Sequence, residues 1–248
     1  NPLTKAEARD TIGYSYDNTI IFDDLQVVLY KTDNTFYTKV DIEDWVNVDK
    51  EGNTVTEDGV SNLYQLDGRA WIDEDYVRSD TTALKLMVFA NYDEVIDCNT
   101  DLQSLTYDFD SSYIPMWGVN TVMVSSLIDD EESDTGVKDK PAVYMLRSMA
   151  RVEIMLSKSL SDQGYALKQM TMNNLNSKGY LLPKDAVNKS ATEKLKLSES
   201  LNPYDSHLLS HTVVGEGSSL VMYVPEYENA GSSLPATINV AMEYCDNG

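Results

Sequence analysis

The chain has 248 residues, enough for one large domain or two ordinary domains that each bury a core. Its 41 acidic and 19 basic residues give a formal net charge of -22, which repels phosphate backbones and anionic lipid heads and argues against nucleic-acid or membrane-surface binding. Two cysteines, Cys98 and Cys245, are too few for a disulfide framework or a thiolate metal site, and whether they pair with each other stays open.

Strand patterns dominate the first half of the chain. The expected strands, all rich in β-branched and aromatic residues, cover 20–22, 25–30, 36–40, 84–91 and 119–124. The Asp-Asn turn at 31–34 joins the second and third of these in a hairpin. Thr100-Asp-Leu-Gln103 has the pattern of a capping box and predicts a short helix.

The charged stretch 129–141, which ends in proline, is the strongest break in composition and predicts a surface loop or linker. We therefore expect an N-terminal domain at 1–141 and a C-terminal domain at 142–248. The strands expected in the second half cover 143–156, 166–173, 178–182, 220–224 and 236–245. Neither long helical periodicity nor strand–helix alternation occurs, so the predicted fold is mostly β: two tandem β-sandwiches with a few short helices.

Metal-binding patterns are weak. His207 and His211 have the spacing of a zinc helix, but Leu208 stands where a zinc protease needs glutamate. The run 47–58 has the oxygen spacing of a calcium loop, although a hairpin turning at 50–53 explains the same residues without a metal. We expect neither a metal nor a cofactor.

Catalytic patterns are weak as well. The carboxylate pairs Asp73/Asp75 and Asp108/Asp110 would suit a glycosidase, but among 41 acids such pairs are expected without a catalytic role. Because these patterns are weak, the chain is predicted not to be an enzyme.

No apolar run approaches the ~20 residues of a membrane-spanning helix.

Tryptophan offers a different kind of candidate site. Trp45 and Trp71 are candidate ligand-stacking residues for a sugar, whereas Trp117 is expected in the core.

Three segments carry a resemblance when they are taken in order. They are Ile114-Pro-Met-Trp-Gly118, the stretch from Tyr144 to Leu156, and Tyr223-Val-Pro-Glu-Tyr227. In the second, apolar residues alternate from Ala150 to Leu156 in the pattern of a strand with one buried face. The trio resembles the fimbrillins, or type V pilins, surface lipoproteins of Gram-negative anaerobes that polymerise into fimbriae.

The resemblance implies two transthyretin-like β-sandwich domains, export as a lipoprotein to the outer membrane, and assembly with self or sister fimbrial subunits. A trypsin-like protease would remove an N-terminal strand, and a strand of another subunit would fill the emptied groove. Arg9 is the expected cleavage site and Lys5 the second choice, with an ordinary exposed basic residue as the alternative. Arg147 and Arg151 are expected in structural ion pairs at the domain junction.

Several points stay open at this stage. After the strand ending near Cys245, Asp246-Asn-Gly248 has the pattern of a hairpin turn, so either the natural chain continues or this sheet lacks a strand. A stalk, tip or anchor role is undecided, as is contact with a host surface. The alternative function is a surface lipoprotein that binds carbohydrate through Trp45 and Trp71 on the same scaffold.

Overall fold

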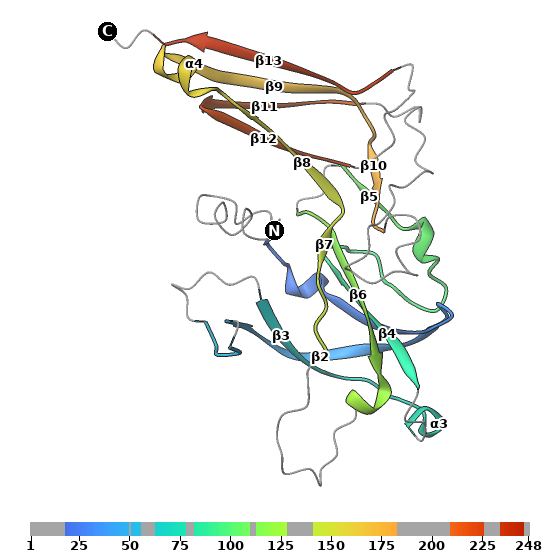
Figure 1. The fold of residues 1–248 in the computed structure, drawn as a ribbon. Coiled ribbons are helices and arrows are strands. Elements are labelled where there is room, and N and C mark those ends of the chain that lie inside the picture. Colours follow the sequence, from blue (N-terminus) through green and yellow to red (C-terminus); the bar gives the residue numbers. More distant parts are fainter. Residues whose placement is uncertain are drawn as a thin grey trace. The chain divides into compact units, whose positions relative to one another are not determined.

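The computed structural model describes residues 18–49, 51–55, 63–77, 82–109, 113–127, 141–182, 209–225 and 234–245 (Figure 1). Within these ranges the chain is mostly strand with a few short helices, which confirms the predicted mostly-β class. The transthyretin-like topology stays a prediction. Predictions that lie outside the described residues concern Lys5, Arg9, Asp110, His207 and most of the 129–141 loop.

The described residues form two compact units. Of the described residues, those within 18–100 and 116–146 belong to unit 1, and those within 101–115, 147–182 and 209–245 belong to unit 2. This grouping differs from a simple division at 141/142 because residues 101–115 cluster with the later strands. The reason is that β5 (Thr106–Asp108) pairs antiparallel with β10 (Lys178–Tyr180). The predicted domain boundary itself stays a prediction.

Unit 1 is built on a six-stranded sheet with the order β3-β2-β1-β4-β6-β7. The strands are β1 (Gln26–Lys31), β2 (Phe36–Val48), β3 (Leu63–Arg69), β4 (Ala83–Ala90), β6 (Met116–Met123) and β7 (Leu146–Arg147). Its short helical elements are η1 (Phe22–Asp24), α3 (Glu74–Val77) and η3 (Val124–Ser126). The central strands β1 and β4 are buried on both faces, as their nearly continuous apolar runs require.

The N-terminal part of unit 1 differs from the sequence prediction at two places. Residues 20–22 were expected as a strand, but Phe22 begins the 3-10 helix η1. β2 runs eight residues beyond the expected end at Val40, and β3 was not predicted. The second half of β2 is mostly exposed and acidic, so it lacks the apolar alternation by which a strand is recognised, and pairing with β3 holds it extended.

Unit 2 contains a β-sandwich. One sheet has the order β11-β9-β13 and the other pairs β12 with β8. The strands are β8 (Met149–Met155), β9 (Tyr165–Leu175), β11 (Leu209–Gly217), β12 (Ser219–Pro225) and β13 (Thr237–Tyr244). α4 (Lys158–Asp162) connects β8 to β9. β11 was not predicted, because its glycines and polar residues obscure the strand pattern.

The core of this sandwich comes from the facing sides of the two sheets, chiefly from β9 and β12. Its buried members are Leu167, Met170, Met172, Leu175, Leu220, Met222 and Val224. The four apolar residues at alternate positions from Ala150 to Leu156 pack against this cluster, which confirms the predicted buried face of β8. Arg151 pairs with Glu153 of the same strand at 3.4 Å.

The strand expected over 143–156 is interrupted at Ser148. The backbone N–H of Ser148 donates to the Pro115 carbonyl at 2.9 Å, and its hydroxyl donates to the Leu181 carbonyl at 2.7 Å. The Tyr107 hydroxyl donates to the carbonyl of Ser148. These bonds connect β5, β8 and β10 outside the strand ladders, so a single uninterrupted strand was the wrong prediction here.

The predicted helix at 100–105 is shorter than expected and has another cap. η2 (Leu102–Ser104) is a 3-10 helix, and the Asp101 side chain accepts from the Gln103 N–H at 3.1 Å. The Thr100 hydroxyl instead accepts from the N–H of Asp97 at 2.9 Å. A short carboxylate one residue later meets the free N–H of the first turn better than the predicted threonine.

Candidate functional site

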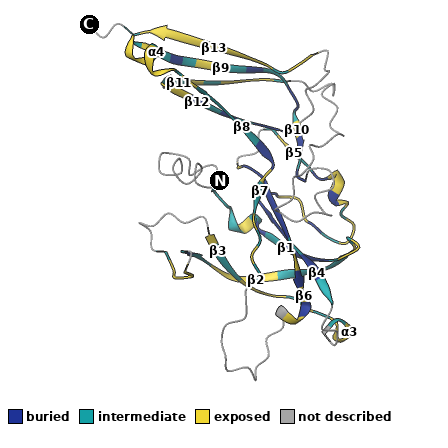
Figure 2. Cartoon of the chain, viewed as in Figure 1, coloured by how far each residue is buried: buried dark blue, intermediate teal, exposed yellow. Residues whose placement is uncertain are grey.

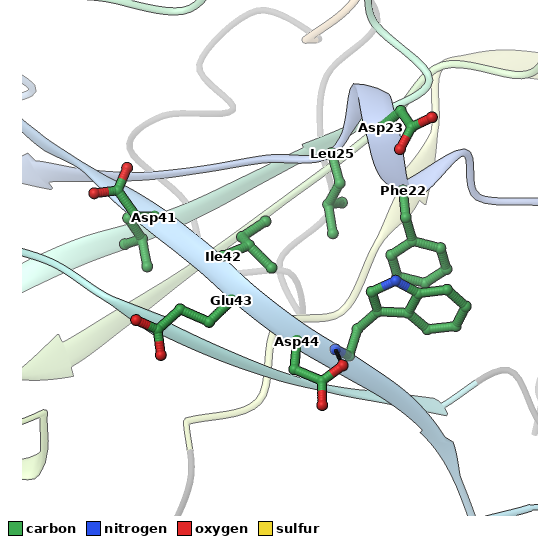
Figure 3. A pocket seen from close by; sticks show the side chains of 9 residues that line it. Phe22, Asp23, Leu25, Asp41, Ile42, Glu43 and Asp44 are labelled. Atoms are coloured by element: carbon green, nitrogen blue, oxygen red, sulfur yellow. Dashed lines mark hydrogen bonds between the residues drawn. The ribbon is translucent and has the colours of Figure 1, made fainter.

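An open hollow of about 470 Å³ lies on unit 1 beside the second half of β2 (Figure 3). It is lined by Phe22, Asp23, Leu25 and residues 40–45. Leu25 belongs to the buried cluster beneath, and Ile42 packs against that cluster. The hollow therefore has an aliphatic floor that is continuous with the core of unit 1.

The hollow forms because β2 is longer than its neighbour β1. The ladder between them runs from Tyr30↔Phe36 to Val27↔Val40, and from Asp41 onward β2 pairs with β3 on its other side. The short helix η1, which precedes β1 in the chain, lies beside this part of β2, where its Phe22 stacks on Trp45. A gap in sheet pairing is thus partly covered by a helical turn, and the remaining space is the hollow.

A stacked aromatic pair forms one wall of the hollow. The rings of Phe22 and Trp45 are parallel, with centroids 3.5 Å apart and an interplanar angle of 1°. Tyr64 of β3 meets both rings edge-on, 5.2 Å from Phe22 and 6.2 Å from Trp45. Trp45 is still 44% exposed, so the pair is anchored on one side and open to solvent on the other.

The backbone of β2 is irregular at the hollow. Ile42 pairs with Gly68 and Asp44 with Asp67, so Glu43 is an extra residue that forms a bulge. Gly68 permits this close approach, because a Cβ at that position would lie 2.8 Å from the Asp41 carbonyl oxygen. The bulge brings three acidic residues, 41, 43 and 44, to the rim within four positions.

The rim is strongly acidic. Asp23, Asp41, Glu43 and Asp44 all line the hollow. Glu43 pairs with the exposed Arg69 guanidinium at 3.1 Å, and Asp44 accepts the backbone N–H of Trp45 at 2.8 Å. Four carboxylates therefore surround an apolar floor, and one guanidinium balances part of their charge.

The two tryptophans predicted to stack on a ligand have different surroundings. Trp45 lines the hollow, whereas Trp71 follows β3 outside the set of lining residues and is 86% exposed. Because Phe22 covers one ring face of Trp45, only the remaining surface of that ring is open to a ligand. Trp117 is 2% exposed, which confirms its predicted place in the core.

Sequence reasoning singled out Trp45 but missed its partners in the hollow. Phe22 was assigned to a strand, and the acidic residues 41–44 were not distinguished among the 41 acids of the chain. The available signal was the cluster Asp41-Ile-Glu-Asp-Trp45, which joins three carboxylates to an exposed aromatic ring.

A second candidate surface is the edge strand β13 of unit 2. Every residue of β13 is exposed (Figure 2). Among the described strands, β13 pairs only with β9, and its apolar residues lie opposite the core face of that strand: Ile238 faces Met172 and Val240 faces Met170. The apolar side chains Ile238, Val240, Met242 and Tyr244 are each 41% to 58% exposed. The core face of this sheet thus continues onto β13 without being covered there.

The structure places the weaker candidate sites in ordinary structural roles. In the described part of the calcium-loop candidate, 47–49 and 51–55, Val48 bridges to Thr54, and Asp49 accepts from the N–H groups of Glu51 at 2.9 Å and Asn53 at 2.8 Å. The side-chain amide of Asn53 also donates to this carboxyl at 3.0 Å and, together with the backbone N–H groups, holds the pKa of Asp49 below its usual value. His211 packs edge-on against Phe109, with ring centroids 5.0 Å apart.

The carboxylate pairs and cysteines are also accounted for. Asp73 accepts the N–H of Asp75 in a turn at 3.1 Å, and Asp108 pairs with Lys178 at 3.4 Å. Cys98 and Cys245 are both free. Within the described ranges no three residues of metal-binding type come together, and no helix is long and apolar enough to cross a bilayer.

Comparison with known proteins gives one structural likeness to report. No protein-family model matches the chain, and no curated protein matches it. A solved structure described as a "putative adhesin" from Bacteroides ovatus is similar, with 12% sequence identity and a TM-score of 0.32 over 89% of this chain. The chain spans 64% of the length of that protein.

Proposed function

We propose that the chain is a structural and adhesive subunit of a bacterial surface fimbria, joined to its neighbours by strand exchange. The observation that carries this proposal is the edge strand β13. It presents an unpaired backbone edge among the described strands and an apolar face whose side chains stay 41% to 58% exposed. Edges of this kind are usually shortened, charged or covered in proteins that remain monomeric.

The composition of β13 favours pairing with another strand. Thr237-Ile-Asn-Val-Ala-Met-Glu-Tyr244 contains no proline and a single charge, that of Glu243, which Lys168 pairs at 2.9 Å. In a chain of net charge -22, this strand is an almost neutral line along which another β-strand can approach. The apolar alternation supplies side-chain contacts in addition to backbone hydrogen bonds.

The gain from covering β13 can be estimated. Full burial of a large apolar side chain contributes about 1.5–3 kcal/mol, and four side chains that are roughly half exposed would gain ~3–6 kcal/mol in total. The backbone hydrogen bonds of one strand edge add to this gain, while association costs part of it. A partner that covers β13 would therefore be held firmly without a covalent bond.

In this proposal the protein is exported as a lipoprotein to the outer membrane and the cell surface, and it has no enzymatic activity or cofactor. Its partners are other fimbrial subunits and a trypsin-like processing protease that cleaves after Arg9. Host surfaces are the targets of adhesion.

Polymerisation tests the proposal directly. The full-length lipoprotein is incubated with trypsin and run on a gel without boiling, beside Arg9→Ala and Lys5→Ala variants. We expect a ladder of oligomers for the natural chain and for Lys5→Ala, and none for Arg9→Ala. Monomers alone, with the N-terminal segment demonstrably removed, would contradict strand exchange.

Carbohydrate binding is the alternative function, and one observation favours it: Trp71 is 86% exposed, so its ring is accessible to a stacking sugar. A glycan-array screen with the natural chain, Trp71→Ala and Trp45→Ala decides the matter. Binding that disappears in both variants supports this alternative, whereas a purely structural subunit binds no glycan.

A further inference from the structure

The hollow beside β2 combines three features that are individually common and together chemically selective. Its floor is aliphatic, from Leu25 and Ile42, and one wall is the partly exposed ring of Trp45 stacked on Phe22. Its rim carries the acidic residues Asp23, Asp41, Glu43 and Asp44. We propose that this hollow binds a basic side chain, lysine or arginine, presented by another protein.

The shape of the hollow suits the two ends of such a side chain. A lysine or arginine has a methylene stem that packs on apolar surface and a cationic head that stays at a polar rim. Leu25 and Ile42 would receive the stem, and Asp41 and Asp44 lie at the rim on the same strand segment (Figure 3). The volume of about 470 Å³ exceeds what one side chain needs, which leaves room for the neighbouring residues of the incoming peptide.

The aromatic wall, like the carboxylates, attracts a cation. The face of an indole ring carries a negative quadrupole that attracts ammonium and guanidinium groups. Trp45 is held rigidly by its stacking on Phe22 and by edge contact with Tyr64, so little ordering is needed when the cation arrives. The open part of the Trp45 ring, next to carboxylates, can therefore add to the attraction of a cation.

The negative charge of the rim disfavours anionic ligands. Four carboxylates line the hollow, and Arg69 pairs with one of them, Glu43. A phosphate or carboxylate ligand would meet net repulsion at the rim, whereas a neutral ligand would gain no charge attraction there. The inference concerns unit 1 alone and goes beyond the proposed assembly function, so it stands or falls independently of β13.

Nuclear magnetic resonance of the ¹⁵N-labelled full chain tests the proposal through its three indole N–H signals. Trp45 reports on the hollow, Trp71 on the exposed surface of the same unit and Trp117 on the core; each signal is assigned with a Trp→Phe variant. The probes are acetylated pentalysine amide, acetylated pentaglutamate amide and maltopentaose. The test variant is Asp41→Asn/Asp44→Asn, in which the amide of residue 44 still accepts from the Trp45 N–H. The matched control is Asp73→Asn/Asp75→Asn, two exposed carboxylates of unit 1 outside the hollow.

We expect pentalysine to shift the Trp45 indole signal saturably, with smaller changes at Trp71 and Trp117 and none caused by pentaglutamate. The Asp41→Asn/Asp44→Asn variant should raise the Kd about fivefold, since each exposed ion pair contributes modestly, while the control variant leaves the Kd unchanged. An equal loss in both variants would show non-specific attraction to the acidic chain and would overturn the proposal. So would an unmoved Trp45 signal, or a saturable shift of that signal by maltopentaose at the same concentration, which would assign the hollow to a neutral sugar.

Discussion

Replacing Gly179 by alanine would bring a methyl group into the space that the Tyr107 ring occupies. The two residues pair directly across β5 and β10. A Cβ at Gly179 would come within 2.7 Å of Cε1 of Tyr107 and still closer to Cζ and Oη. The ring cannot move away freely, because it is 5% exposed and its hydroxyl donates to the Ser148 carbonyl.

The expected cost follows from these contacts. Overpacking a buried site costs about 1–3 kcal/mol, and losing the Tyr107 hydrogen bond adds about 1 kcal/mol. Against this, alanine is better than glycine in a strand by roughly 0.5–1 kcal/mol. Gly179→Ala should therefore lower the free energy of unfolding of unit 2 by ~1–3.5 kcal/mol.

The same substitution in a Tyr107→Val chain tests this reasoning, because the expected effect of Gly179→Ala on stability then changes sign. In a Tyr107→Val chain the ring is absent, so Gly179→Ala should become neutral or stabilise unit 2 by about 0.5 kcal/mol. Urea unfolding followed by far-UV circular dichroism measures all four chains of the cycle. Tryptophan fluorescence gives the reference signal for unit 1, where Trp45, Trp71 and Trp117 all lie. If Gly179→Ala has the same effect in both backgrounds, the Tyr107 ring is not what excludes a side chain at this position.

Three further predictions concern unit 1 and the edge of unit 2. Gly68→Ala should lower the stability of unit 1 by about 1–3 kcal/mol in fluorescence-monitored urea unfolding, because its Cβ would lie 2.8 Å from the Asp41 carbonyl oxygen; an unchanged midpoint would show that the bulge can adjust. Val240→Lys should abolish the oligomer ladder while lowering the stability of the monomer by about 1 kcal/mol, the contribution of the buried part of the side chain. Val214→Lys, at a 75% exposed position on the opposite edge strand of the same sheet, should keep the ladder. Burial, with a smaller contribution from a nearby aspartate, raises the pKa of Tyr30 from 10.0 to about 12. Because folding favours the neutral phenol, its contribution to stability is complete below pH 10 and is lost as the pH rises toward 12. Tyr30→Phe should therefore make the urea midpoint fall less steeply at alkaline pH. An equally steep fall in the variant would contradict the assignment to Tyr30.

The sequence by itself identified the strands in which buried residues alternate with others or follow one another without interruption. The apolar residues at alternate positions from Ala150 to Leu156 identify the inner face of β8 before any fold is known, since side chains alternate across a strand. The run 84–91 is equally clear, because an uninterrupted apolar segment of that length is stable only inside a sheet. Trp117, which lies between small and apolar neighbours, could be placed in the core for the same reason.

Only the tertiary structure decided where the pairing between β1 and β2 stops and which residues lie in the space beside the unpaired part of β2. The second half of β2 is acidic and exposed, and it is a strand only because β3 pairs with it. The hollow depends on β1 ending its ladder at Val27↔Val40 and on Phe22 returning to stack on Trp45. Both are consequences of contacts between segments distant along the chain, which local propensity and periodicity do not record. The alternation of β13 was readable in advance, but its exposure was not, because burial depends on which strands of the facing sheet lie opposite it.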